Sequence, residues 1–151
     1  MLLLKVPHYP QRTQADCLAA CAMMTLSYLG VKVQYQQLLR LLRVSDSGTS
    51  FYNLHHLHTL GVTVQIKDGY IELLDQCIQN NQPVIISVDT VDLPYWQQTS
   101  TLHALVVVGS DQKTIFVNDP AMKTAPQPVD RVWFELAWLR RDYLYATIVS
   151  G

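Results

Sequence analysis

The chain carries few charged residues, and none of them gather in a cluster of one sign. Charged residues make up 15% of the 151 positions, and 11 Lys and Arg against 12 Asp and Glu leave a net charge of −1. Proteins that bind nucleic acid neutralise its phosphates with clustered Lys and Arg, so nucleic acid is not an expected partner. The apolar share of 49% instead predicts a globular chain with a substantial core.

Long apolar runs are also missing. No stretch approaches the roughly 20 apolar residues that a membrane-spanning helix needs. The start, MLLLKVPHYP, has too short an apolar part for a signal peptide, and Lys5 and Pro7 interrupt it. We therefore expect a cytoplasmic protein.

Cysteine is scarce, and the odd number of three argues against a disulfide framework. Cys17 and Cys21 share a helix face, but no second Cys or His pair has the spacing of a zinc site. His55 and His58 also share a face, without an acidic or thiol partner motif. The sequence thus predicts neither a metal nor a cofactor, and Cys77 is interpreted as a core residue.

The hydrophobic pattern changes from helical spacing in the first half to β-branched runs in the second. Asp16 and Ser50 suit helix N-caps, and Gly30 and Gly61 suit helix ends. No repeat or linker divides the chain, so we expect one domain over 1–151, an α+β fold with N-terminal helices packed on a C-terminal antiparallel sheet. The pattern predicts helices over 17–29, 34–43, 51–60, 70–80 and 130–139, and strands over 2–6, 62–66, 83–89, 103–110, 114–119 and 143–150.

Cys17 stands where the run Gln11-Arg-Thr-Gln-Ala-Asp-Cys17 meets the first long helix. The unpaired N–H groups and partial positive charge of a helix N-terminus favour a thiolate over a thiol. Gln11 can place its side-chain amide beside the thiol, where this amide and the Cys17 N–H would donate to a developing oxyanion. Gln14 is the competing amide. A buried structural cysteine and a solvated glutamine are the alternatives.

His103 begins an apolar strand, and Asp119 ends the next one. Two antiparallel strands joined by a turn near 111–113 bring His103 and Asp119 to the same end of a sheet. There His103 suits a general base, and Asp119 can hold the imidazole by its other nitrogen. Asn118 is the alternative partner, because an amide also serves beside a thiol nucleophile. The run Asn118-Asp119-Pro120 equally fits a plain turn.

Taken together, these residues resemble the papain-like cysteine peptidases. Within them the chain is most similar to the bacteriocin-processing family that cleaves double-glycine leader peptides, and to its stand-alone relatives. That family carries Gln, four residues, then Asp-Cys before an Ala-rich, Met-containing helix, and this chain has QRTQADC and LAACAMMTLSYLG. The family also has a His opening a Val-rich strand and an Asp-Pro after the following strand, matched here by HALVVVG and NDP.

The resemblance implies a thiol protease, a hydrolase without cofactor, that works through a thioester acyl-enzyme. It assigns Cys17 as nucleophile, His103 as base, Asp119 as the orienting acid and Gln11 as oxyanion donor. The implied substrate is a peptide or protein, such as a leader peptide, cut after small residues of the Gly-Gly type. An export transporter is a candidate partner, and the oligomeric state is left open.

Two departures from the family bear on specificity. Leu18 stands where exporter-linked peptidases usually carry Gly, and we expect it to line and reshape the entrance of the site. No transporter segment follows residue 151, so a stand-alone protein and an excised domain both fit.

The loop over 90–102 is long and polar and precedes His103. We expect Tyr95 or Trp96 to wall the substrate groove near the scissile bond, and the alternative is that Trp96 fills the core beneath the loop. Deamidation and transpeptidation share the acyl-enzyme and remain alternatives to hydrolysis. A module that binds leader peptides without cutting them is the other alternative, although binding needs no thiol.

Overall fold

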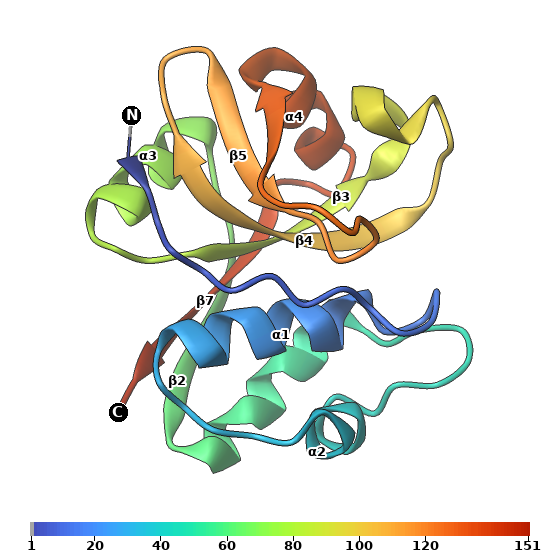
Figure 1. The fold of residues 1–151 in the computed structure, drawn as a ribbon, viewed down its shortest axis with the longest axis vertical. Helices are drawn as coiled ribbons and strands as arrows, with labels where there is room; N and C mark the ends of the chain where they lie inside the picture. The colour runs from blue at the N-terminus through green and yellow to red at the C-terminus, as the bar shows by residue number, and fades with distance from the viewer. Residues whose placement is uncertain (1) are drawn as a thin grey trace.

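Residues 2–151 are described by a computed structural model built around one antiparallel sheet (Figure 1). Within this range the sheet has seven strands, in the order β2-β7-β3-β4-β5-β6, with β1 added to β4 outside that path. Every pairing is antiparallel. The strands are β1 (Leu2–Leu3), β2 (Val62–Asp68), β3 (Val84–Asp89), β4 (Leu102–Ser110), β5 (Thr114–Asn118), β6 (Gln127–Asp130) and β7 (Leu144–Ser150).

Helices cover both faces of the sheet, with α1 and α2 on one side and α3 and α4 on the other (Figure 1). The first face also carries a long 3₁₀ helix, η1, and two short 3₁₀ turns, η2 and η3, lie between β3 and β4. No helix within residues 2–151 has the length and apolar character to cross a membrane. The helices are α1 (Cys17–Tyr28), α2 (Tyr35–Leu41), η1 (Phe51–Leu60), α3 (Ile71–Gln79), η2 (Thr90–Asp92), η3 (Pro94–Trp96) and α4 (Arg131–Leu139).

Helix α1 is buried along nearly its whole length, as expected for a helix that is apolar all round. Ala19, Ala20 and Ala22 have no exposed surface, and their small side chains let the helix lie close to the sheet. Cys17 is the first residue of α1 and stays partly exposed. The packing of α1 therefore fixes the thiol at the N-terminal end of the helix, where it stays accessible.

Strand β4 is buried on both faces. Val106 packs with the α1 cluster, whereas Leu105 and Val107 pack with the α3 and α4 cluster. The pairing of β4 with β5 shifts register between Val107 and Gly109, which marks a β-bulge. At Gly109 strand β1 comes so close that a Cβ atom would lie 2.9 Å from the Leu2 carbonyl oxygen, so the position requires glycine.

The α+β class and the predicted packing of N-terminal helices on an antiparallel sheet are confirmed. In addition, α3 and α4 cover the opposite face, and residues 51–60 form a 3₁₀ helix. Strand β6 was not predicted, because its four residues include Pro128 and carry no readable alternation. The expected Asp16 cap is wrong: its side chain makes no bond to α1, and it binds the preceding loop instead.

Candidate active site

Cys17 and His103 meet at one cavity of about 310 Å³, although one residue comes from α1 and the other from β4. The thiol lies close enough to the imidazole to help raise its pKa. The imidazole Nε2 lies 2.7 Å from Oδ1 of Asp119. A thiol and an imidazole thus share one cavity, and a carboxylate binds the imidazole, which is the order of groups that an activated nucleophile, its base and an orienting acid require.

Asp119 is completely buried and surrounded by hydrogen-bond donors. Oδ1 accepts from His103 and from the backbone N–H of Ala121 at 2.9 Å. Oδ2 accepts from the Tyr95 hydroxyl at 2.6 Å and from the Trp96 indole N–H at 2.9 Å. Since every partner donates, the site is built for an ionised carboxylate.

The pKa values of this group of residues follow from these contacts. Burial alone would lower the pKa of His103, but its hydrogen bonds with Asp119 and Cys17, and their charges, raise it to about 9. Burial alone would raise the pKa of Asp119, but the bonds from His103, Tyr95 and Trp96 lower it overall. Burial and the Asp119 charge raise the pKa of Tyr95, which keeps its hydroxyl protonated as a donor. The arrangement therefore favours a protonated imidazole beside the thiol near neutral pH.

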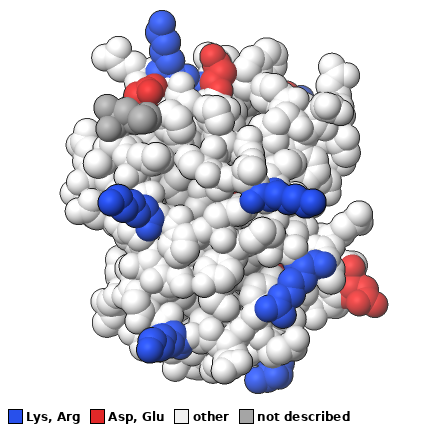
Figure 2. Space-filling view, in the orientation of Figure 1, with Lys and Arg blue, Asp and Glu red and all other residues white. Residues whose placement is uncertain are grey.

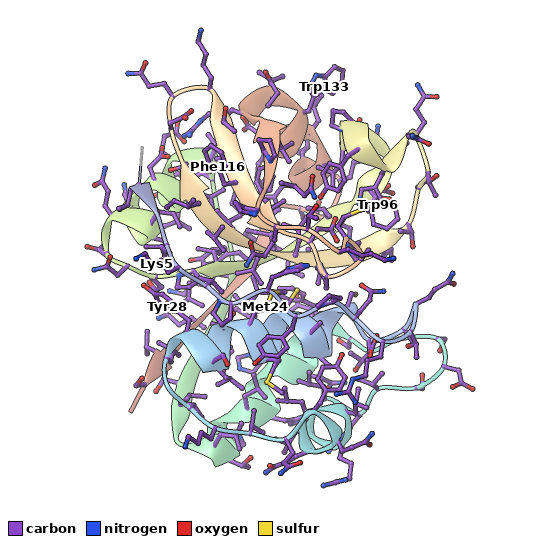
Figure 3. All side chains as sticks on the ribbon, in the orientation of Figure 1. Lys5, Met24, Tyr28, Trp96, Phe116 and Trp133 are labelled. Carbon is purple, nitrogen blue, oxygen red and sulfur yellow. The ribbon has the colours of Figure 1, made fainter. Side chains whose placement is uncertain are left out.

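The structure places Tyr95 and Trp96 differently from our expectation. Neither lines the cavity at Cys17; both come from the loop that Figure 3 shows before β4 and point to Asp119. The Trp96 ring also packs edge-on against His103, with centroids 5.0 Å apart. These side chains therefore donate hydrogen bonds to the acid, and Trp96 also packs on the imidazole, but neither lines the cavity at Cys17. No sequence signal shows this, because the loop has no period from which side-chain directions can be read.

Gln11 lies beside this group through its backbone, whose N–H donates to the Pro120 carbonyl at 2.7 Å. Its side-chain Nε2 donates to the Thr13 carbonyl at 2.8 Å, and its Oε1 is buried without a partner among the described residues. An amide nitrogen carries two N–H bonds, so one stays available for another acceptor. The loop between Gln11 and Cys17 is folded around Asp16, which accepts from the Arg12 and Thr13 N–H groups.

The competing residues lie elsewhere. The Asn118 amide donates to the Val6 carbonyl, so Asp119 and not Asn118 faces the imidazole. Gln14 is exposed and lines a separate surface hollow. Leu18 lines the Cys17 cavity, as expected, while most of its side chain is buried in the core.

The cavity also contains residues that the sequence gave no reason to choose. Ser87 comes from β3 and Arg141 from the turn after α4, far from each other and from Cys17 in the chain. Neither belongs to a motif, and only the folded chain brings them together.

Iodoacetamide is expected to alkylate Cys17 before the other two cysteines. Cys21 has no exposed surface, and burial, followed by the nearby Cys17 and Asp119, raises the pKa of its thiol. Burial also raises the pKa of Cys77, which is 8% exposed. Brief labelling followed by peptide mass spectrometry measures the order, and protein unfolded in urea, where all three should react alike, is the control. Equal labelling of the native protein would contradict the structure.

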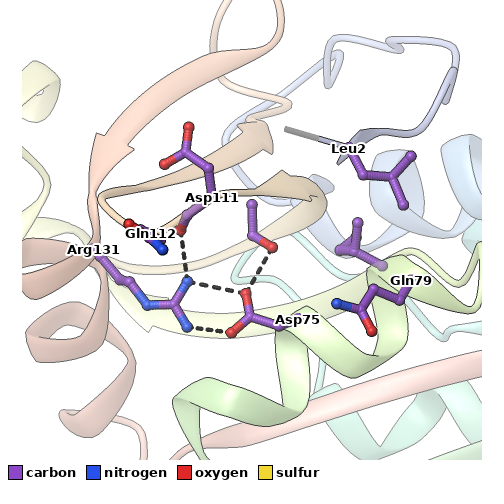
Figure 4. Close-up of a pocket in the computed structure, with 8 residues that line it drawn as sticks. Leu2, Asp75, Gln79, Asp111, Gln112 and Arg131 are labelled. Atoms are coloured by element: carbon purple, nitrogen blue, oxygen red, sulfur yellow. Dashed lines mark hydrogen bonds and ion pairs between the residues drawn. The ribbon is translucent and has the colours of Figure 1, made fainter.

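A second, larger cavity of about 620 Å³ lies away from Cys17 (Figure 4). There Arg131 binds both carboxylate oxygens of Asp75, and the Ser110 hydroxyl donates to the same acid. This ion pair joins α3 to the start of α4 and neutralises both of its charges. Among residues 2–151 no group of three His, Cys, Asp or Glu side chains could hold a metal ion. On the face seen in Figure 2, the Lys and Arg side chains lie apart from one another.

This fold, with a thiol at a helix N-terminus facing a histidine on the sheet, is that of the papain-like peptidases. Within that class the chain belongs to the Peptidase C39 like family, whose family model matches residues 3–145. Membership in this family supports a peptidase function. Among curated proteins, none matches the sequence significantly.

Solved structures with the same fold share about a fifth of their residues with this chain. A protein of Bacillus anthracis described as a C39-like peptidase has a TM-score of 0.83 and 20% identity, over 99% of this chain and 98% of its own. The double-glycine motif protease of an AMS/PCAT transporter, solved with its leader peptide, has a TM-score of 0.77 and 21% identity, over 99% of this chain and 94% of its own. The peptidase domain of Streptococcus ComA, an ABC transporter of a quorum-sensing pathway, has a TM-score of 0.77 and 19% identity, over 95% of this chain and 98% of its own.

Proposed function

We propose that the protein is a cysteine peptidase that cleaves peptide bonds through a thioester acyl-enzyme. The observation that carries the proposal is that the Cys17 thiol shares a cavity with the His103 imidazole, whose Nε2 is held by buried Asp119. A structural cysteine needs no such partners. A protein that only binds peptides would have no use for an imidazole that stays protonated beside a thiol.

In the proposed reaction the Cys17 thiolate attacks the carbonyl carbon of the scissile bond. The tetrahedral oxyanion accepts hydrogen bonds from the Cys17 N–H and from the Gln11 amide, whose second N–H is available. His103 gives its proton to the departing amine as the C–N bond breaks, which leaves a thioester on Cys17. His103 then removes a proton from water, whose oxygen attacks the thioester; the C–S bond breaks, the acid is released, and the Cys17 thiolate is restored beside the protonated imidazole.

The proposed substrate is a peptide or protein. Two structural neighbours are transporter peptidases, one of them bound to a leader peptide, which makes a leader-like substrate and an association with an export transporter reasonable proposals for this chain. Processing of bacteriocin-like peptides in the cytoplasm stays a prediction. Leu18 at the cavity makes strict Gly-Gly cleavage the least supported part of the proposal.

Incubation with a mixed peptide library, read by mass spectrometry, tests the proposed function. Hydrolysis is expected to yield two fragments from each substrate peptide. Deamidation would give a small mass increase without fragments, and transpeptidation would give new joined products. Peptides that are retained by the protein but remain intact would indicate a binding module and contradict the peptidase proposal.

A further inference from the structure

The cavity beside Cys17 and His103 contains a charged group that the proposed chemistry does not use. Arg141 lines this cavity and is only partly exposed. Arg141 is the only Lys or Arg in the lining, and the lining contains no Asp or Glu.

Arg141 has no carboxylate partner within residues 2–151. Its only side-chain hydrogen bond is a long one, from Nε to the neutral Ser87 hydroxyl at 3.4 Å. Two other arginines of the same region differ in this respect, because Arg131 pairs with Asp75 and Arg140 pairs with Asp92. A partly buried guanidinium without an anion leaves most of its five donors unused.

The backbone fixes where this charge lies. The Arg141 N–H donates to the Trp138 carbonyl, and the Arg141 carbonyl accepts from the Leu144 N–H. The residues between, Asp142 and Tyr143, both have positive φ, which marks a tight turn. The guanidinium thus extends from a well-held turn into the cavity at Cys17, and its removal would break no backbone contact.

We propose that this cavity binds a carboxylate of the substrate close to the scissile bond and that Arg141 selects for it. The inference rests on the proposed peptidase function in so far as the substrate is a peptide. Arg141 supplies the charge, and the hydroxyl of Ser87 supplies a further donor. The apolar walls formed by Leu18 and Leu144 suit the methylene groups of a Glu side chain. A subsite for glycine would need neither the volume nor the charge.

A positional library of acetylated, amidated hexapeptides tests this inference. One position at a time is fixed as Glu, Gln, Gly or Lys, so that side chains carry the only charges under comparison. The expected result is faster cleavage of Glu pools than Gln pools at one position near the cut, on the order of 10- to 100-fold. Arg141→Gln should abolish this preference, and Arg141→Glu should transfer it to the Lys pools. A parallel set of neutral hexapeptides with free carboxyl ends shows whether the carboxylate is that of a chain terminus.

Arg140→Gln is the matched control. It removes a neighbouring arginine that pairs with Asp92 and does not line the cavity, so the Glu preference should persist in it. Cleavage without a Glu or carboxyl-end preference, or a preference that Arg141→Gln leaves intact, would overturn the inference while the peptidase proposal stands.

Binding separates the two proposals. The same pools are passed over immobilised Cys17→Ala protein, and the retained peptides are identified by mass spectrometry. Retention of Glu or free-carboxyl peptides that is lost in Cys17→Ala/Arg141→Gln supports the inference even where no pool is cleaved by the wild type. If peptides are neither cleaved nor selectively retained, both proposals fail.

Discussion

Replacing Cys17 by alanine is expected to abolish peptide cleavage while leaving the fold intact. The thiol is the proposed nucleophile, and loss of the nucleophile in a comparable acyl-transfer enzyme costs on the order of 10⁶-fold in kcat. Cys17 is partly exposed at the open end of α1, so its truncation leaves no cavity in the core. Single-turnover cleavage of a library-derived substrate measures the loss, and circular dichroism verifies the fold.

Cys77→Ala is the control for this variant. It removes another thiol, which is buried in the hydrophobic cluster beneath α3 and α4 and does not line the cavity at Cys17. Its cleavage rate should be close to that of the wild type. A Cys17→Ala protein that cleaves as fast as Cys77→Ala would rule out the cysteine mechanism.

Asp119→Asn is expected to damage this site more than the similar size of the two side chains suggests. The carboxylate accepts two hydrogen bonds on each oxygen, and an amide has only one oxygen. The amide NH₂ group would then replace one of the two oxygens. Two of the four donors would face it without an acceptor, either those of Tyr95 and Trp96 or those of His103 and Ala121. Each unpaired buried donor costs about 1–3 kcal/mol, and loss of an orienting aspartate costs up to about 10⁴-fold in kcat.

The pH profile of this variant tests the cause of that loss. In the wild type, the alkaline limb of kcat/KM should fall with an apparent pKa of about 9, as the His103 imidazolium loses its proton. Without the Asp119 charge the limb should move toward the ordinary histidine pKa of about 6.5. Tyr95→Phe, which removes one donor and inserts none, should lower the rate less and leave the limb nearly in place. An unshifted limb in Asp119→Asn would show that Asp119 does not set the protonation of His103.

The contact between His103 and Asp119 also makes the stability of the fold depend on pH. The pKa of His103 is raised, so its contribution to stability is fully present below about 6.5 and is lost as the pH rises through about 9. The pKa of Asp119 is lowered, so its contribution is present above its unfolded value and is lost as the pH falls through the folded one. Urea unfolding at pH 7 and pH 10 should therefore show a smaller difference in Asp119→Asn than in the wild type.

The parts of the site that lie on regular elements could be predicted from the sequence. Cys17 follows from a helix start, and the meeting of His103 with Asp119 follows from hairpin arithmetic over sixteen residues. Their chemical roles remain predictions. Tyr95 and Trp96 could not be placed, because the 3₁₀ turns of their loop give side chains no regular alternation.

Other features depended on tertiary contacts that no local pattern contains. Asp16 has the sequence position of an N-cap, yet its carboxylate binds the Thr13 N–H and the Tyr35 hydroxyl, which comes from another helix. That partner lies nineteen residues away, and a local capping rule does not account for it. Arg141 likewise belongs to no sequence motif, and only the folded chain brings it to the cavity at Cys17.

The bulge in β4 decides which side of the sheet the acid occupies. Next to the site the pairs are Val106 with Asn118 and Val107 with Val117, so one more step places Asp119 opposite Leu105, on the same side as His103. Beyond the bulge, Gly109 pairs with Phe116. If that register continued unbroken, Asp119 would stand opposite Val106 and point toward the α1 layer instead. The single extra residue in β4 therefore keeps the imidazole and the carboxylate on one side of the sheet. With one residue fewer between His103 and Asp119, the two side chains would point to opposite faces, whatever their identity.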